Sequence, residues 1–123
     1  MRVMHVMAGA AEGGAENIML ESVLALAETD LEQHVVTRPN NDFRIQKFRE
    51  AGIGVDVAAF NNSWPFPTRR VIADAITQFK PDVIEYWMGR AGQFAPKQYR
   101  TRSIGWYGGY YKLARFAQCE WPV

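Results

Sequence analysis

The hydrophobic positions of the chain follow two alternating patterns, short continuous apolar runs and longer stretches with helical spacing. The apolar runs predict strands buried on both faces, over residues 2–7, 33–37, 55–58, 83–86 and 102–105. The spaced stretches predict helices over residues 15–28, 42–51 and 68–79, and short helical turns over 94–99 and 113–116. Asp42 and Thr68 are the predicted N-caps of the second and third helices, because short polar side chains pair with free amides there.

Alternation of strands and helices favours a parallel sheet, because right-handed crossover helices bring each new strand back in the same direction. We therefore predict an α/β fold, a Rossmann-like, doubly wound, mainly parallel sheet of about five strands with helices on both faces. At 123 residues the chain forms a single domain, residues 1–123. Ligands of such sheets bind beyond the carboxyl ends of the strands. The loops at that edge are 8–14, 38–41, 60–68, 87–93 and 106–111.

The first of these loops is a glycine-rich turn that opens directly into the first predicted helix, with Gly9, Gly13 and Gly14 in it. Amides in the first turn of a helix lack intrahelical partners and carry partial positive charge, so the turn suits a phosphate or another anion. It matches neither the G-x-G-x-x-G dinucleotide fingerprint nor the G-x-x-x-x-G-K-[ST] phosphate loop. Thr37 and Arg38 also stand where a ribose-binding acidic residue would end the second strand. An NAD(P)-binding protein is therefore the least favoured alternative.

Composition adds few constraints: 48% of the residues are hydrophobic and 22% are charged, as in ordinary globular proteins. The sequence contains neither an apolar run of membrane-spanning length nor a signal-peptide pattern. The single cysteine, Cys119, has no internal disulfide partner, so we expect a reducing cytoplasm. His5 and His34 lie in apolar runs without metal-ligand spacing, so we expect buried or edge strand residues and no metal site.

Charge is spread unevenly along the chain. Residues 1–62 carry nine acidic and five basic side chains, whereas residues 63–123 carry four acidic and nine basic ones. A positive second half favours an anionic ligand or the anionic face of a membrane, although ordinary solvated charge is an equally good explanation.

Three segments carry recognisable motifs in the order of the chain. Residues 13–16 read G-G-A-E, residues 80–92 read KPDVIEYWMGRAG and residues 104–111 read IGWYGGYY. Together they resemble the glycine loop, the P-D-[VI]-[VI]-H-x-H-x-x-x-A segment and the fifth-strand loop of family 4 glycosyltransferases. Those are retaining enzymes of GT-B architecture. The chain departs from the family pattern where histidines are common, at Glu85 and Trp87 and at Trp106 or Tyr107.

The resemblance implies two Rossmann-like domains that face each other across a cleft, the first of which binds the acceptor. The chain would be a truncated N-terminal half, while a second domain with an E-x7-E pattern would hold the nucleotide-sugar. In the family the glycine loop lies against the donor diphosphate, so the candidate residues for the donor diphosphate or the acceptor loop are Gly13, Gly14 and Glu16. Alternatively, the glycines are present only because a tight turn requires glycine for steric reasons. For Glu16 we favour a carboxylate that reaches back to cap the loop.

The remaining candidates belong to the acceptor side. A guanidinium at Arg90, after the fourth strand, can hold a carboxylate or phosphate as a fork, unless it is simply a solvated surface arginine. Aromatic rings offer flat faces to the C–H side of a sugar, unless they only pack in the core. The candidate acceptor-binding residues are Trp87, Arg90, Trp106, Tyr107, Gly108 and Gly109. No catalytic residue is assigned.

We therefore expect the acceptor-binding domain of a glycosyltransferase that moves a sugar from a nucleotide-sugar to a hydroxyl with retention, in cell-envelope or exopolysaccharide synthesis. The expected partners are a sugar or lipid-linked acceptor, the nucleotide-sugar once a second domain is present, and the inner membrane face, with no cofactor and no nucleic acid. A sheet without a sixth strand exposes an edge that predicts a homodimer. Alone, the chain is expected to be inactive. The alternative is a non-catalytic Rossmann-like binding or self-associating domain.

Overall fold

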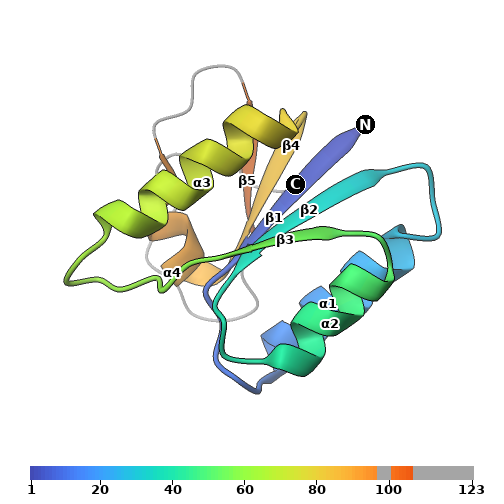
Figure 1. The fold of residues 1–123 in the computed structure, drawn as a ribbon, viewed down its shortest axis with the longest axis horizontal. Helices are drawn as coiled ribbons and strands as arrows, with labels where there is room; N and C mark the ends of the chain where they lie inside the picture. The colour runs from blue at the N-terminus through green and yellow to red at the C-terminus, as the bar shows by residue number, and fades with distance from the viewer. Residues whose placement is uncertain (97–100, 107–123) are drawn as a thin grey trace.

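The computed structural model describes residues 1–96 and 101–106, in which strands and helices alternate from β1 to β5 (Figure 1). The strands are β1 (Arg2–Met7), β2 (Glu32–Thr37), β3 (Gly54–Val57), β4 (Val83–Trp87) and β5 (Arg102–Trp106). The helices are α1 (Gly14–Leu26), α2 (Asp42–Glu50), α3 (Phe66–Phe79) and α4 (Met88–Gln93).

The strands form one parallel sheet in the order β3-β2-β1-β4-β5. From β1 the chain moves outward through β2 to β3 and then crosses back to β4 on the other side of β1. Met7, at the end of β1, is in register with Thr37 of β2 and with Trp87 of β4. The structure confirms the predicted doubly wound fold, and the strand order reverses beside β1, where a crevice opens at the carboxyl edge in such sheets.

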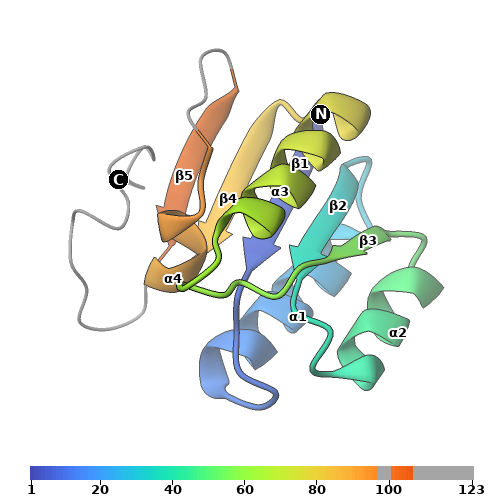
Figure 2. The same cartoon turned by 60° about the vertical axis from the view of Figure 1, so that its left-hand side comes forward.

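Helices cover both faces of the sheet, α1 and α2 on one and α3 and α4 on the other (Figures 1 and 2). Two core clusters result, because successive side chains of a strand point to opposite faces. Residues of the α3 side include Met4, Val6, Val36, Ile72 and Ile84. Residues of the α1 side include Met7, Met19, Val23, Val35 and Phe48. Burial on both faces is the reason that the strands read as continuous apolar runs.

The predicted cap of α2 is wrong by one residue. Asn41, not Asp42, is the N-cap, since its side-chain oxygen accepts a hydrogen bond from the Arg44 amide at 2.9 Å. Asp42 is instead the first helical residue, where its negative charge suits the helix dipole.

The other two helix predictions also need correction. α3 begins at Phe66, ahead of the predicted cap Thr68, because proline in a first turn loses no hydrogen bond. The helical turn expected over 94–99 is wrong at its start: α4 follows β4 directly and ends before Phe94, and residues 97–99 lie outside the described residues. The turn expected over 113–116 also lies outside them.

Thr68 has a structural task other than capping. Its hydroxyl oxygen accepts a hydrogen bond from the Phe60 amide at 2.9 Å. Phe60 has a φ of 53°, a left-handed conformation that is uncommon for a bulky residue. Its fully buried ring meets Phe94 edge-on, with ring centroids 5.5 Å apart. The hydrogen bond thus satisfies a buried amide in the strained turn between β3 and α3.

We expect the substitution Thr68→Val to keep the side-chain shape but leave the buried Phe60 amide without an acceptor. An unsatisfied buried donor costs about 1–3 kcal/mol, which should appear as a loss of unfolding free energy in urea denaturation. Thr77→Val is the matched control, because Thr77 donates only to the Ala73 carbonyl on the exposed side of the same helix. Equal losses in the two variants would contradict this role of Thr68.

Candidate functional site

The candidate site lies at the carboxyl edge of the sheet, around the end of β1. The glycine loop, residues 8–13, leaves β1 there and leads into α1. The start of α2 and the start of α4 reach the same edge, since they follow β2 and β4 and these strands flank β1. Three segments far apart in the sequence therefore meet at one edge of the sheet, where a ligand-binding crevice opens in doubly wound folds.

Glu16 holds the glycine loop from the α1 side. Its Oε1 accepts a hydrogen bond from the Ala10 amide at 2.9 Å, and the side chain is only 9% exposed. A methyl group at Gly9 would lie 2.5 Å from Cγ of Glu16, and one at Gly13 would collide with Oε2. Glycine is needed at both positions because the carboxylate lies against their backbone. The predicted structural role of Glu16, a carboxylate that reaches back to cap the loop, is confirmed.

Gly14 differs from its two neighbours in the loop. It is exposed, and a methyl group there would meet nothing within 4 Å. The steric explanation therefore accounts for Gly9 and Gly13 but not for Gly14. No side chain caps the first turn of α1, so its amides stay suited to an anion. Contact of Gly13 and Gly14 with a donor diphosphate remains a prediction.

The start of α2 holds the loop from the opposite side. Asn40, Asn41 and Arg44 donate side-chain hydrogen bonds of 2.7–3.1 Å to the carbonyls of residues 9–11. From the sequence, this segment is predicted only as a turn and a helix. These hydrogen bonds, which clamp the loop, were not predicted. Their signal is the order N-N-x-x-R, which begins three residues after the end of the second strand and puts one guanidinium and two amides at one helix start.

Arg44 is the buried charge of this clamp, at 4% exposure. Desolvation by burial lowers its pKa, and the Glu16 carboxylate partly offsets that shift. The guanidinium stays protonated, because its ordinary pKa lies far above neutrality. The loop thus lies between a carboxylate that accepts from its amide and a guanidinium that donates to its carbonyls.

Trp87 lies inside the domain rather than on its surface. It is 4% exposed, and its indole Nε1 donates to His5 Nδ1 at 3.1 Å. His5 Nε2 donates to Gln33 Oε1 at 2.8 Å, and Gln33 Nε2 donates to the Val23 carbonyl at 3.0 Å. An indole nitrogen can only donate, so His5 Nδ1 must be the acceptor and the imidazole is neutral. The hydrogen bonds link β4, β1, β2 and α1.

The pKa of His5 agrees with this proton assignment. Burial lowers it from 6.5 to about 4, against the opposing hydrogen bond to Gln33. Glu85 Oε1 lies 3.6 Å from His5 Nδ1, but a neutral imidazole forms no ion pair with it. Burial also raises the pKa of Glu85. Burial thus shifts both groups toward their uncharged forms, by lowering the pKa of His5 and raising that of Glu85.

Trp106 is the aromatic candidate that remains partly exposed. Its ring packs on that of Trp87, with centroids 4.9 Å apart and planes at 43°. Trp87 thus supports Trp106 instead of presenting a face of its own. The other acceptor-side candidates of this segment, Tyr107, Gly108 and Gly109, lie outside the described residues.

Two arginines reach the crevice from the α3 side. Arg38 follows β2 and donates to the carbonyls of Ala59 at 3.1 Å and Phe60 at 3.4 Å. Arg90 lies half-buried in α4. Burial lowers the pKa of Arg38, and the positive charge of Arg90 lowers it further. Sequence reasoning identified Arg90 but noted Arg38 only as a departure from the dinucleotide pattern, since their proximity depends on the fold.

The chain is 33% identical, over an aligned length of 128 residues, to the lipopolysaccharide core biosynthesis glycosyltransferase LpsD of Rhizobium meliloti (strain 1021). The alignment covers 99% of this chain and 37% of LpsD, so the chain spans little more than a third of that relative. No protein-family model matches. The chain is similar to part of a glycosyltransferase.

Metal and membrane features are not seen in the described part of the chain. Residues 1–96 and 101–106 contain no group of three or more His, Cys, Asp or Glu side chains that could hold a metal ion. Over the same residues, no helix has the length and apolarity needed to cross a bilayer.

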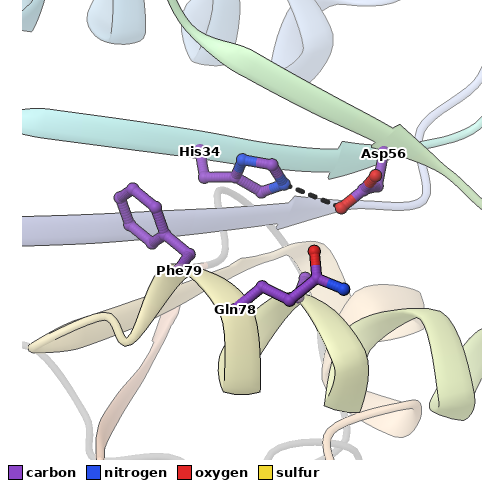
Figure 3. A pocket seen from close by; sticks show the side chains of 5 residues that line it. His34, Asp56, Gln78 and Phe79 are labelled. Carbon is purple, nitrogen blue, oxygen red and sulfur yellow. Dashed lines mark hydrogen bonds and ion pairs between the residues drawn. The ribbon is translucent and has the colours of Figure 1, made fainter.

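A pocket lies away from this edge, between α3 and the middle of β2 and β3 (Figure 3). It is a pocket of about 230 Å³ lined by His34, Asp56, Ala75, Gln78 and Phe79. His34 Nε2 and Asp56 Oδ2 are 2.9 Å apart, and the imidazole packs on the Phe79 ring at 5.4 Å. His34 is thus a strand residue, as its apolar context predicts. The pocket contains none of the predicted site residues.

We expect the free energy of unfolding to fall as the pH drops below about 6.5, because unfolded His5 takes up a proton before native His5 does. This loss should be about 2 kcal/mol between pH 7 and 5, and it ends near the native pKa of about 4. Glu85 acts in the opposite direction at lower pH, since its raised pKa lets the native state bind a proton first. Urea denaturation at pH 7, 6 and 5 measures the effect.

His5→Gln should remove most of this pH dependence, while the control His34→Gln should keep it. His34 is largely buried at the other face, with 18% of its side chain exposed, and it pairs with Asp56. An unchanged slope in His5→Gln would show that His5 is not the titrating group.

The two neighbouring glycines should respond to alanine with opposite signs. Gly13→Ala displaces the Glu16 carboxylate and breaks its hydrogen bond to Ala10, at a cost of roughly 1–2 kcal/mol. Gly14→Ala meets open space and should stabilise by about 0.4–1 kcal/mol, because alanine has less freedom in the unfolded chain. Urea denaturation checks both, and a double-mutant cycle with Glu16→Ala should abolish the penalty at Gly13. A penalty that persists in the cycle would contradict the contact with Glu16.

Proposed function

We propose that the chain is the acceptor-side domain of a retaining glycosyltransferase of GT-B architecture that acts in the synthesis of an envelope polysaccharide. The observation that carries this proposal is the similarity to LpsD, which extends over 99% of the chain. The G-G-A-E segment and the reversal of strand order beside β1 support it, since they put an anion-suited helix start at the ligand-binding edge.

In the proposed reaction the bond between the anomeric carbon and the diphosphate oxygen breaks, and a bond to the acceptor hydroxyl oxygen forms with retention. The acceptor proton is released, and negative charge accumulates on the leaving diphosphate. The first turn of α1 favours that charge through its free amides and its dipole. The clamp on residues 9–11 keeps the loop rigid, so that little reorganisation is needed when the charge develops.

The acceptor would lie along the carboxyl ends of β4 and β5. The partly exposed face of Trp106 suits the C–H side of a sugar, and Arg90 suits an anionic group beside it. Tyr107, Gly108 and Gly109 complete the proposed acceptor loop. Trp87 contributes indirectly, because its ring packs against that of Trp106.

A second domain would supply most of the nucleotide-sugar site. The chain spans 37% of LpsD, and a GT-B enzyme binds its donor between two Rossmann-like domains. We therefore propose that the 123-residue chain transfers no sugar by itself. A cytoplasmic location, contact with the inner membrane face and pairing of two copies through a sheet edge remain further predictions.

A chimera tests the proposed function. LpsD with its matching segment replaced by this chain should restore the lipopolysaccharide core in a strain of Rhizobium meliloti that lacks LpsD. Core size is read from gel mobility and mass spectrometry. The matched control is LpsD with the same segment deleted, which should restore nothing.

A folded and abundant chimera that leaves the core truncated would contradict the proposal and favour a non-catalytic binding domain. The isolated chain, mixed with nucleotide-sugars and acceptor extracts, should show no turnover above background. Robust transfer by the isolated chain would contradict the need for a second domain.

A further inference from the structure

We propose that Arg38 and Arg90 together bind a phosphate group that the acceptor carries, at a site across the crevice from the first turn of α1. The anion site follows from the described residues alone. Only its assignment to the acceptor rests on the proposed function.

The register of the sheet brings both arginines to the end of β1. Met7 is in register with Thr37 on one side and with Trp87 on the other. Arg38 directly follows Thr37, and α4 with Arg90 directly follows Trp87. The two side chains therefore flank the point where the strand order reverses, which is the ligand-binding position of doubly wound sheets.

One packing contact holds the two arginines on the same face. Arg38 donates to the Phe60 carbonyl, and the ring of Phe60 packs edge-on against Phe94. Phe94 lies one helical turn after Arg90 along the α4 segment. The fully buried aromatic pair therefore ties together the backbone segments from which the two arginines extend.

No carboxylate within the described part of the chain balances the charges of this pair. Among the described residues, neither Arg38 nor Arg90 has a carboxylate in ion-pair distance, unlike Arg2 with Glu32. The positive charge of Arg90 is near enough to disfavour the charge of Arg38. Two unpaired positive charges match a phosphate monoester, which carries about two negative charges at neutral pH. Guanidinium forks also match phosphate oxygens geometrically.

This site differs from the predicted diphosphate site at the glycine loop. The loop leads into α1, whereas α4 covers the opposite face of the sheet, as Figure 1 shows. The carbonyls of residues 9–11 are directed to the α2 clamp and away from any anion. The crevice thus has two anion sites, one on each face, which suits a charged donor and a charged acceptor at once.

Titration of the 123-residue chain with glucose 6-phosphate, followed by two-dimensional NMR at constant ionic strength, tests the site. We expect saturable binding with a Kd on the order of 1 mM. Arg90→Gln should weaken this binding about tenfold, because half of the charge complement is lost. The matched control Arg70→Gln should leave it unchanged, since Arg70 is exposed on α3 and pairs with Asp74. UDP serves as the donor probe, and Arg90→Gln should not alter its binding.

Arg90 is the primary variant because Arg38 also donates to two backbone carbonyls, so Arg38→Gln can disturb the turn after β3. Thermal unfolding supplies a second readout. Phosphate should raise the Tm of the wild type but not that of Arg90→Gln. Without phosphate, Arg90→Gln should melt above the wild type, because the like-charge repulsion is gone. Arg90→Glu should pair with Arg38 and abolish phosphate binding.

Glucose 6-phosphate binding that is absent, or that is unchanged in Arg90→Gln, would overturn this inference. Loss of UDP binding alone in Arg90→Gln would show that the arginines serve the donor diphosphate, and it would overturn the assignment to the acceptor. These outcomes are separate from the chimera experiment. A failed chimera with intact phosphate binding would refute the proposed function and leave the anion site in place.

Discussion

The burial of β1 on both faces and along both edges is the constraint on which the rest of the domain depends. β1 pairs with β2 and β4, so its backbone is satisfied only if both neighbours are present and parallel. Its last four residues, Met4–Met7, are fully buried, so a polar side chain among them has no access to water. His5 is therefore neutral and hydrogen-bonded to Trp87 and Gln33, and its network ties three strands to α1. The same burial positions the end of β1 as the centre of the functional edge.

The glycine loop is held by a hydrogen-bond acceptor on one side and by hydrogen-bond donors on the other. Glu16 accepts from the loop amide on one side, while Arg44 and its two asparagine neighbours donate to the loop carbonyls on the other. Gly9 and Gly13 make room for the carboxylate, and Gly14 stays open to the outside. The loop is thus rigid where it contacts protein and open where α1 begins. This combination suits a helix start that must meet negative charge without moving.

The unpaired arginines at the opposite side of the crevice have a cost to the fold. Two neighbouring positive charges destabilise a domain unless an anion joins them. Some other charged side chains of the described residues form ion pairs, as Arg70 does with Asp74. Arg38 and Arg90 lack such partners among the described residues, and they lie at the edge where doubly wound sheets bind ligands.

Local sequence patterns are enough to predict the alternation of strands and helices, the parallel sheet and the loop that Glu16 caps. These features depend on local periodicity and on contacts within one loop and one helical turn, and such information is contained in a short stretch of chain. Only the tertiary structure decided the partners of distant residues. Trp87 turns inward to His5, 82 positions away, and Arg44 reaches the loop from 33 or more positions away. Such pairs depend on which side chains the crossovers bring together, so no local pattern contains them.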